Sequence, residues 1–205
     1  MADFSQNVRA LSAAAWRLRR AAAQPCDIPF ALALFTDDRR QGNIEAMLSN
    51  LPKASRALPP IAIVFRHDGL AAKQRYLLAK RILEVTHRRG HFFLMARGYI
   101  AGANGQHAPH TFNLSPRSSF ISTPAHSIAE GVEGQRKGAH LSFISPIFPT
   151  ASHPGARPLG VARAGAIAHS LRQPTFALGG VNLETAKRLH GTPFQGIGAI
   201  SAFST

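Results

Sequence analysis

Two glycine-containing segments near the C-terminus have the composition of a phosphate-binding site. Gly179-Gly180-Val181-Asn182 follows an apolar run and precedes a helical pattern. Glycine lets a phosphate approach the backbone, and a helix start offers free N–H donors. Gly196-Ile197-Gly198-Ala199-Ile200-Ser201 has the same layout one apolar run later. We therefore predict a phosphate site at Gly179, Gly180, Ile200 and Ser201; the alternative is that these glycines only make tight turns.

A long loop rich in hydroxyl groups follows an earlier apolar run, and it runs from Ser145 to His153. Its Thr150 and Ser152 can donate hydrogen bonds to phosphate or pyrophosphate oxygens, and His153 adds positive charge at low pH. We place these three residues on the substrate side of the site. An ordinary surface loop remains the alternative.

Other polar side chains also stand directly after apolar runs. If the runs are parallel strands, their carboxyl ends meet at one face, where ligands bind. Further candidates are Asp37, Asp38, Arg66, His67, Asp68, Arg97, His107, His110, Thr123 and His126. Among them the histidines have the side chains best suited to proton transfer near neutral pH.

The elements that must position these residues alternate between short apolar runs and helical patterns. The runs lie at 30–35, 61–65, 91–95, 106–110, 120–122, 141–144, 175–178 and 194–197. Helical spacing appears at 44–51, 71–87, 97–103, 128–137, 162–171 and 183–189, with a final turn at 200–203. In the second helix we expect Tyr76 and Leu77 to face the core. This rhythm predicts a buried parallel sheet, and its count and length favour a (β/α)8 TIM barrel over an open doubly wound sheet.

The first 25 residues are expected to form an additional N-terminal helix, because Val8, Leu11, Ala15 and Leu18 recur at helical spacing. This helix either covers the barrel floor or pairs two chains, so a homodimer is left open. No linker or repeat divides the sequence, and we predict one domain over residues 1–205.

Composition narrows the function classes. The net charge is +14, which favours anionic ligands. The basic residues are spread over the whole chain. No nucleic-acid motif accompanies the charge, so we expect a phosphorylated small molecule as the partner rather than nucleic acid. The single cysteine, Cys26, excludes an internal disulfide and is expected to be buried near the first strand. No apolar stretch could span a membrane and no secretory signal is evident, so we expect a cytoplasmic protein.

Several of these segments resemble the thiamine phosphate synthase family. They are Gly138-Ala139-His140, Phe148-Pro149-Thr150 with Leu159-Gly160, Ala177-Leu178-Gly179-Gly180-Val181-Asn182, Ile200-Ser201-Ala202, Phe35-Thr36-Asp37 and Phe65-Arg66. The resemblance implies a (β/α)8 barrel that joins an aminopyrimidine pyrophosphate to a thiazole phosphate. It also implies pyrophosphate contacts from Arg66, Thr150 and Ser152, and a thiazole phosphate held by Gly180, Ile200 and Ser201.

The sequence departs from that family where the synthases bind magnesium and pyrophosphate. Val64 and Asp68 replace a glutamine and a lysine, and Ala96-Arg97 replaces an Asn-Asp pair. Residues 107–113 contain no carboxylate, His153 replaces a lysine and Pro124 replaces a serine. Because Mg²⁺ requires oxygen ligands, usually carboxylates, we expect no metal and no other cofactor.

A sister branch of the family shares this pattern of losses, and its resemblance implies a different reaction. That branch aromatises a carboxylated thiazole phosphate by moving a proton, with a histidine placed as His126 is. Our first hypothesis is therefore a tautomerase-like enzyme with His126 as acid/base and Arg97 on the substrate carboxylate. The alternatives are a divergent synthase that replaces Mg²⁺ with Arg66, Arg97 and His153, and a barrel without catalysis that binds a phosphorylated thiazole or nucleic acid.

Overall fold

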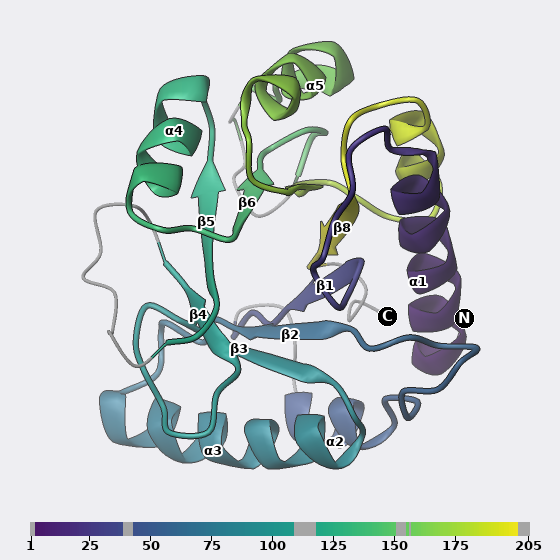
Figure 1. Ribbon diagram of the computed structural model, residues 1–205. Coiled ribbons are helices and arrows are strands. Elements are labelled where there is room, and N and C mark those ends of the chain that lie inside the picture. The colour runs from purple at the N-terminus through teal and green to yellow at the C-terminus, as the bar shows by residue number, and fades with distance from the viewer. Residues whose placement is uncertain (1–2, 39–42, 109–117, 151–154, 156, 201–205) are drawn as a thin grey trace.

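The structure is a computed structural model that describes residues 3–38, 43–108, 118–150, 155 and 157–200. Eight parallel strands pair in chain order, and the last strand pairs with the first, which closes the barrel (Figure 1). The strands are β1 Leu32–Phe35, β2 Ala62–Phe65, β3 Phe92–Ala96, β4 Gly105–His107, β5 Ile121–Ala125, β6 Leu141–Ile144, β7 Thr175–Ala177 and β8 Gly196–Ala199. The predicted TIM barrel is confirmed.

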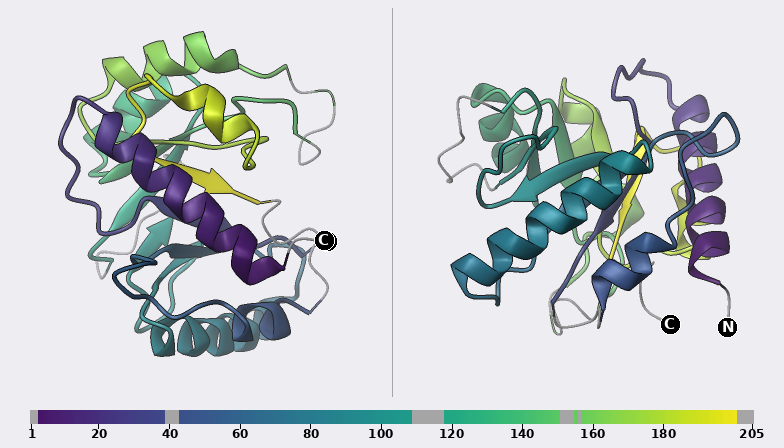
Figure 2. Two further views of the ribbon diagram at one scale, coloured as in Figure 1. Left: turned by 90° about the vertical axis from the view of Figure 1, so that its right-hand side faces the viewer. Right: turned by 90° about the horizontal axis from the view of Figure 1, so that it is seen from below.

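The helices lie around the outside of the barrel (Figure 2). They are α1 Phe4–Ala21, α2 Ile44–Ser49, α3 Ala72–Arg88, α4 Ile128–Arg136, α5 Gly160–Ser170 and the 3₁₀ helix η1 Thr185–Leu189. Among the described helices, none is long and apolar enough to cross a membrane.

The barrel interior is packed with aromatic rings. Phe30 contacts Phe176 with ring centroids 5.9 Å apart, and Phe143 contacts both Phe176 at 5.7 Å and Phe35 at 5.0 Å. Successive strand residues point to opposite faces, so alternate residues such as Ala33 and Phe35 fill this interior, while their neighbours pack against the helices. The interior below the mouth is therefore a solid core.

Gly196 and Gly198 serve this packing, which corrects the expectation that they begin a second phosphate turn. Both lie inside β8. A Cβ on Gly196 would lie 2.6 Å from the Phe176 ring, and one on Gly198 would lie 3.1 Å from the Phe35 ring. These glycines leave room for the core rings. The segment that follows β8 starts at Ile200.

The N-terminal helix α1 packs against β8, β1 and η1 on the side of the barrel. Its Val8, Leu11, Ala15 and Leu18 are buried, as predicted from their spacing. Arg19 anchors its C-terminal end: Nε donates to the Gln195 carbonyl at 2.8 Å, and the guanidinium also donates to the carbonyls of Ile28 and Phe30. Burial lowers the pKa of Arg19. The helix therefore lies along the side of the barrel and not over its floor as expected, while the pairing of two chains stays a prediction.

Four local expectations were wrong. Residues 97–103 form turns rather than a helix, because Arg97 and Gly102 adopt positive φ angles of 47° and 87°. Tyr76 and Leu77 are 51% and 46% exposed instead of facing the core. The helix expected at 183–189 is the short 3₁₀ turn η1, a common form for such brief segments. Cys26 is only partly buried.

Candidate functional site

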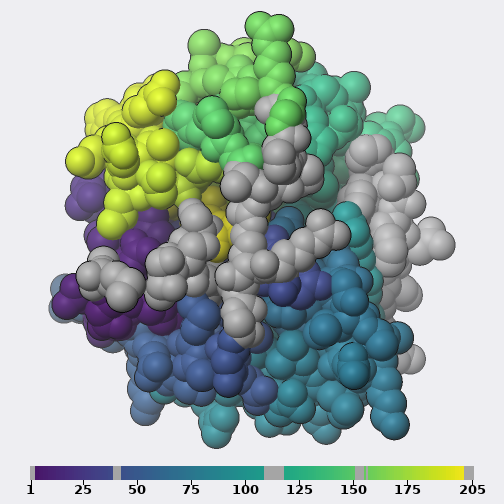
Figure 3. Space-filling view, turned by 180° about the vertical axis from the view of Figure 1, so that it is seen from behind, coloured from purple at the N-terminus to yellow at the C-terminus, as the bar shows by residue number. Residues whose placement is uncertain are grey.

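A cavity of about 380 Å³ opens at the carboxyl ends of the strands. Its lining residues lie at the ends of the eight strands or in the segments that follow them: Phe35, Arg66, Ala96, Arg97, His107, Pro124, His126, Ser145, Pro146, Thr150, Leu178, Gly179 and Ile200. The view from behind shows segments from both halves of the chain, blue, green and yellow, meeting on one face (Figure 3). We call this space the mouth cavity.

Six of the residues singled out from the sequence line the mouth cavity, namely Arg66, Arg97, His126, Thr150, Gly179 and Ile200. Gly180 lies next to the lining in the turn after β7. Ser152, His153 and Ser201 lie outside the described residues, as does His110. The strand ends thus bring these residues and His107 to one cavity, whereas the candidates Asp37, Asp38, His67, Asp68 and Thr123 are not among its lining residues.

His126 directly follows β5 and has a fixed ring orientation. Its Nδ1 lies 2.6 Å from the carbonyl oxygen of Ser145, and its backbone N–H donates to Glu130 Oε2 at 3.0 Å. A carbonyl can only accept, so Nδ1 carries the proton in the neutral ring and Nε2 keeps its lone pair. The exposed His126 thus brings a proton acceptor to the mouth cavity.

His107, at the end of β4, forms part of the cavity floor. Its ring lies between Phe35 and Phe143, with centroid distances of 5.2 Å and 5.4 Å. Nδ1 lies 3.0 Å from Ser122 Oγ, which in turn donates to the Gln106 carbonyl. Burial, followed by the charges of Arg66 and Arg97, lowers the pKa of His107 to about 3. The floor is therefore neutral at physiological pH.

Two arginines supply positive charge at the rim of the cavity, and each already has a carboxylate partner. Arg66 Nη2 lies 2.7 Å from Asp37 Oδ2, and Arg97 Nη1 lies 3.1 Å from Asp68 Oδ2. The Arg66 side chain is 26% exposed and that of Arg97 is 56% exposed. A guanidinium has five N–H donors, so both retain donors for an anionic ligand.

The turn after β7 is shaped by its two glycines. Gly179 and Gly180 have φ angles of 89° and 67°, and a Cβ on Gly180 would lie 2.4 Å from the Pro149 carbonyl oxygen. Within the described part of the chain, neither glycine N–H has an acceptor. The first N–H groups of η1 differ: those of Glu184 and Thr185 donate to Asn182 Oδ1. Free donors therefore come from the glycine turn and not from the helix start that the sequence suggested.

Some lining residues had no assigned role in the sequence analysis. His107 was only one candidate among many, because β4 has three residues and its inward side could not be read from periodicity. Phe35, Pro146 and Leu178 are apolar and resemble core residues in sequence. His67 was a candidate, but it lies beside Thr36 with Nδ1 2.9 Å from Oγ1, and its ring stacks on Phe65. Burial lowers the pKa of His67, and it does not line the mouth cavity.

The carboxylates near the mouth do not fit a Mg²⁺ site. Asp37 faces Arg66, both oxygens of Asp68 face arginines, and Asp38 Oδ2 accepts from the Gly69 N–H. All ten Asp and Glu residues of the sequence belong to the described part of the chain, and there no cluster of three His, Cys, Asp or Glu could hold a metal. Magnesium requires oxygen ligands that these neighbours already occupy.

Comparisons with known proteins agree with this architecture. Residues 32–203 match the family described as thiamine monophosphate synthase. A thiamine-phosphate synthase of Clostridium botulinum is 30% identical over 149 residues, 67% of this chain and 73% of the relative. One from Pyrococcus furiosus is 24% identical over 182 residues, covering 83% and 85%. The solved structure of the thiamine phosphate pyrophosphorylase of Pyrococcus furiosus superposes with a TM-score of 0.67 at 22% identity, covering 85% of this chain and 88% of that one.

Proposed function

Because the chain belongs to the thiamine monophosphate synthase family, we propose that its mouth cavity binds a carboxylated thiazole phosphate and moves a proton on it. The observation that carries the proposal is the fixed His126 ring, whose Nδ1 is held 2.6 Å from the Ser145 carbonyl. The product is the aromatic thiazole phosphate that still carries the carboxylate, so the substrate and product are isomers.

The phosphate group is assigned to the glycine turn. Gly179 and Gly180 offer backbone N–H donors without acceptors in the described structure, and backbone donors suit phosphate oxygens. Ile200 lines the same end of the cavity. By the resemblance noted above, Ser201 completes this phosphate site, and Thr150, Ser152 and His153 act on the loop side.

The carboxylate is assigned to Arg97, with Arg66 as the second cation at the rim. An arginine presents paired N–H donors that match the two oxygens of a carboxylate. This places the negative groups of the ligand at the glycine turn and at the β3 end, on different sides of the mouth cavity. The ring then lies over the neutral floor that includes His107.

His126 carries the proton. Its Nε2 lone pair takes a proton from a carbon of the non-aromatic ring system, and the resulting imidazolium returns a proton to a conjugated carbon. The Ser145 carbonyl stabilises the protonated ring because it accepts from Nδ1 in both states. No electrons are exchanged and no leaving group forms, so the step requires no metal.

The second candidate function is the synthase reaction, which the names of the relatives favour. That reaction must hold two substrates together. The mouth cavity of about 380 Å³ lies at the lower end of the roughly 300–1,000 Å³ range of ligand sites, and its size favours one small ligand. In addition, Asp37 and Asp68 are paired with arginines, so they are not available as carboxylate ligands for the Mg²⁺ of a magnesium pyrophosphate.

A turnover assay on the carboxylated thiazole phosphate tests the proposal, with ultraviolet absorbance reporting formation of the aromatic ring. His126→Asn should reduce turnover by about 10²–10⁴-fold while ligand affinity changes little. His169→Asn, on an exposed position of α5, is the matched control and should leave turnover unchanged.

Two outcomes would overturn the proposal. Full turnover in the His126→Asn protein would exclude this residue as the acid/base. Formation of thiamine phosphate from the two synthase substrates, with no isomerisation of the carboxylated thiazole, would favour the transferase instead.

A further inference from the structure

Arg97, at the end of β3, separates two hollows on the surface. It lines the mouth cavity and also a second recess of about 470 Å³ outside the barrel, between the start of α3 and the turn after β3. Its side chain is 56% exposed. A long, exposed arginine ordinarily samples many rotamers, and ordering it on ligand binding costs conformational entropy.

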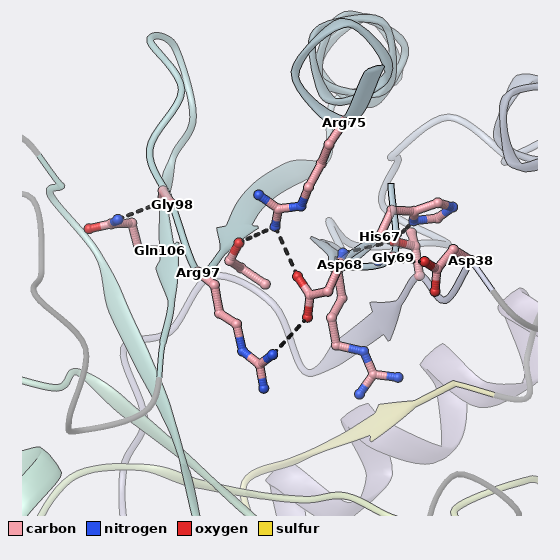
Figure 4. Close-up of polar contacts among 11 residues, drawn as sticks. Asp38, His67, Asp68, Gly69, Arg75, Arg97, Gly98 and Gln106 are labelled. Atoms are coloured by element: carbon pink, nitrogen blue, oxygen red, sulfur yellow. Dashed lines mark hydrogen bonds and ion pairs between the residues drawn. The ribbon is translucent and has the colours of Figure 1, made fainter. Parts of the chain in front are cut away.

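Asp68 restrains this side chain from the outer recess. Its Oδ2 lies 3.1 Å from Arg97 Nη1, and its other oxygen, Oδ1, lies 3.2 Å from Arg75 Nη2 (Figure 4). Asp68 lines the recess but is not part of the mouth cavity lining. The carboxylate is therefore placed to orient Arg97 without contacting a ligand in the mouth cavity.

Arg75 in turn fixes Asp68. The Arg75 side chain is only 15% exposed, packs over the Phe65 ring at 5.8 Å and donates to the Ala96 carbonyl. Ala96 directly precedes Arg97, whose own N–H donates to the His107 carbonyl at 3.0 Å. The contacts form a closed circuit from Arg75 through Asp68 to Arg97 and back through the backbone.

We propose that Asp68 and Arg75 are positioning residues that hold the Arg97 guanidinium ready for the acid group of the ligand in the mouth cavity. This proposal rests on the function proposed above. One donor nitrogen of Arg97 is used by Asp68, and the remaining donors are presented in a single orientation. Asp68 thereby sets the preference for a carboxylated ligand over the same phosphate ligand without the carboxylate.

The direction in which Asp68→Asn changes ligand affinity distinguishes a positioning role from a purely electrostatic one. Asp68→Asn removes a negative charge near the rim, so a purely electrostatic role predicts tighter binding of every anion. Positioning predicts the opposite for one ligand only: weaker binding of the carboxylated thiazole phosphate, by about tenfold for one restrained side chain, and unchanged binding of thiazole phosphate itself.

Calorimetric titration of both ligands into wild type, Asp68→Asn, Arg75→Lys and Glu45→Gln makes this test. Glu45→Gln is the matched control, since it removes the same charge from the surface ion pair with Arg81 at 2.9 Å. Asp68→Asn and Arg75→Lys should show the selective loss, and Glu45→Gln should not. Asp68→Asn in an Arg97→Gln background should add no further loss. Equal tightening of both ligands in Asp68→Asn and Glu45→Gln would overturn the proposal.

A second readout does not depend on the ligand. Side-chain NMR of the free protein should show an ordered Arg97 guanidinium in wild type and Glu45→Gln, and a mobile one in Asp68→Asn. An unchanged Arg97 signal in Asp68→Asn overturns the positioning role even if both ligands bind. Wild-type protein that binds neither ligand overturns the proposed function, while loss of order in Asp68→Asn would still support the restraint of Arg97.

Discussion

Two histidines line the mouth cavity at the ends of the neighbouring strands β4 and β5, and their different surroundings indicate different roles. His126 is exposed and its Nδ1 is tied to a carbonyl, which leaves Nε2 for proton transfer. His107 is buried between two phenyl rings and stays neutral. We expect His107 to shape the floor and His126 to carry the proton.

His107 should make the protein sensitive to acid. Its pKa is lowered to about 3 in the folded state, against an ordinary value of 6.5. Between these values the unfolded chain binds a proton that the folded chain does not, so the free energy of unfolding falls as pH decreases from about 6.5 to about 3. His107→Gln should flatten this dependence by up to about 1.4 kcal/mol per pH unit.

Urea unfolding at pH 7, 5.5 and 4.5 measures that difference. His67 and His91 also have pKa values lowered by burial, so wild type and the His107→Gln variant must be compared at each pH. Parallel stability profiles for the two proteins would contradict the assignment.

Gly180 should be intolerant of a side chain. Gly180→Ala must adopt a φ of 67° and bring Cβ to 2.4 Å from the Pro149 carbonyl oxygen. Gly191→Ala is a close control, because Gly191 has a φ of 77° but nothing within 4 Å of the added Cβ. We expect Gly191→Ala to cost about 1 kcal/mol of unfolding free energy, and Gly180→Ala to cost more and weaken phosphate binding. Equal losses in the two variants would show that the contact with Pro149 is easily relieved.

At the scale of elements, the parallel strands were the part most accessible to prediction. Runs such as 61–65 are apolar on both faces because the barrel core lies on one side and helices lie on the other. Polar residues after those runs could be placed at the mouth for the same reason. The strand-end rule therefore predicted polar residues that line the mouth cavity, such as Arg66, Arg97 and His126.

The conformations of the connections after β3 and β7 could not be predicted from the sequence in this way. The positive φ of Arg97 has no signal in the sequence, and it ends the pattern that suggested a helix at 97–103. The stripe of α3 that packs inward is Ala79, Ile82 and Thr86, while the larger Tyr76 and Leu77 are exposed. Ion pairs such as Arg97 with Asp68 depend on these loop conformations and could not be predicted from spacing.

A partly buried cation, Arg19, ties the C-terminal end of α1 to the barrel. Arg19 donates to three backbone carbonyls and lies over the Trp16 ring at 4.8 Å and the Phe176 ring at 5.5 Å. Arg19→Met keeps much of the apolar contact but leaves the carbonyls of Ile28, Phe30 and Gln195 without this donor. We expect a loss of about 3 kcal/mol in unfolding free energy.

Arg9→Met, on the exposed side of the same helix, is the control for Arg19→Met. Thermal unfolding should distinguish the two, with a marked decrease in Tm only for Arg19→Met. A similar Tm for both variants would show that the apolar stripe of α1 holds the helix without Arg19.

At the scale of the whole molecule, α1 and the barrel share one apolar cluster. We propose on this basis that residues 1–205 fold as one domain. The closed barrel brings residues at or directly after all eight strands around one cavity. The excess of basic residues adds a positive field that attracts phosphorylated ligands.

Proton exchange on the ligand tests the central claim most directly. Carboxylated thiazole phosphate is incubated with the protein in D₂O containing excess chelator, and the product is examined by NMR. We predict aromatic carboxylated thiazole phosphate that carries solvent deuterium on carbon, at the same rate with and without chelator, and none with His126→Asn. Absence of the aromatic product with wild type, or product that forms only when Mg²⁺ is added, would contradict metal-free proton transfer by His126.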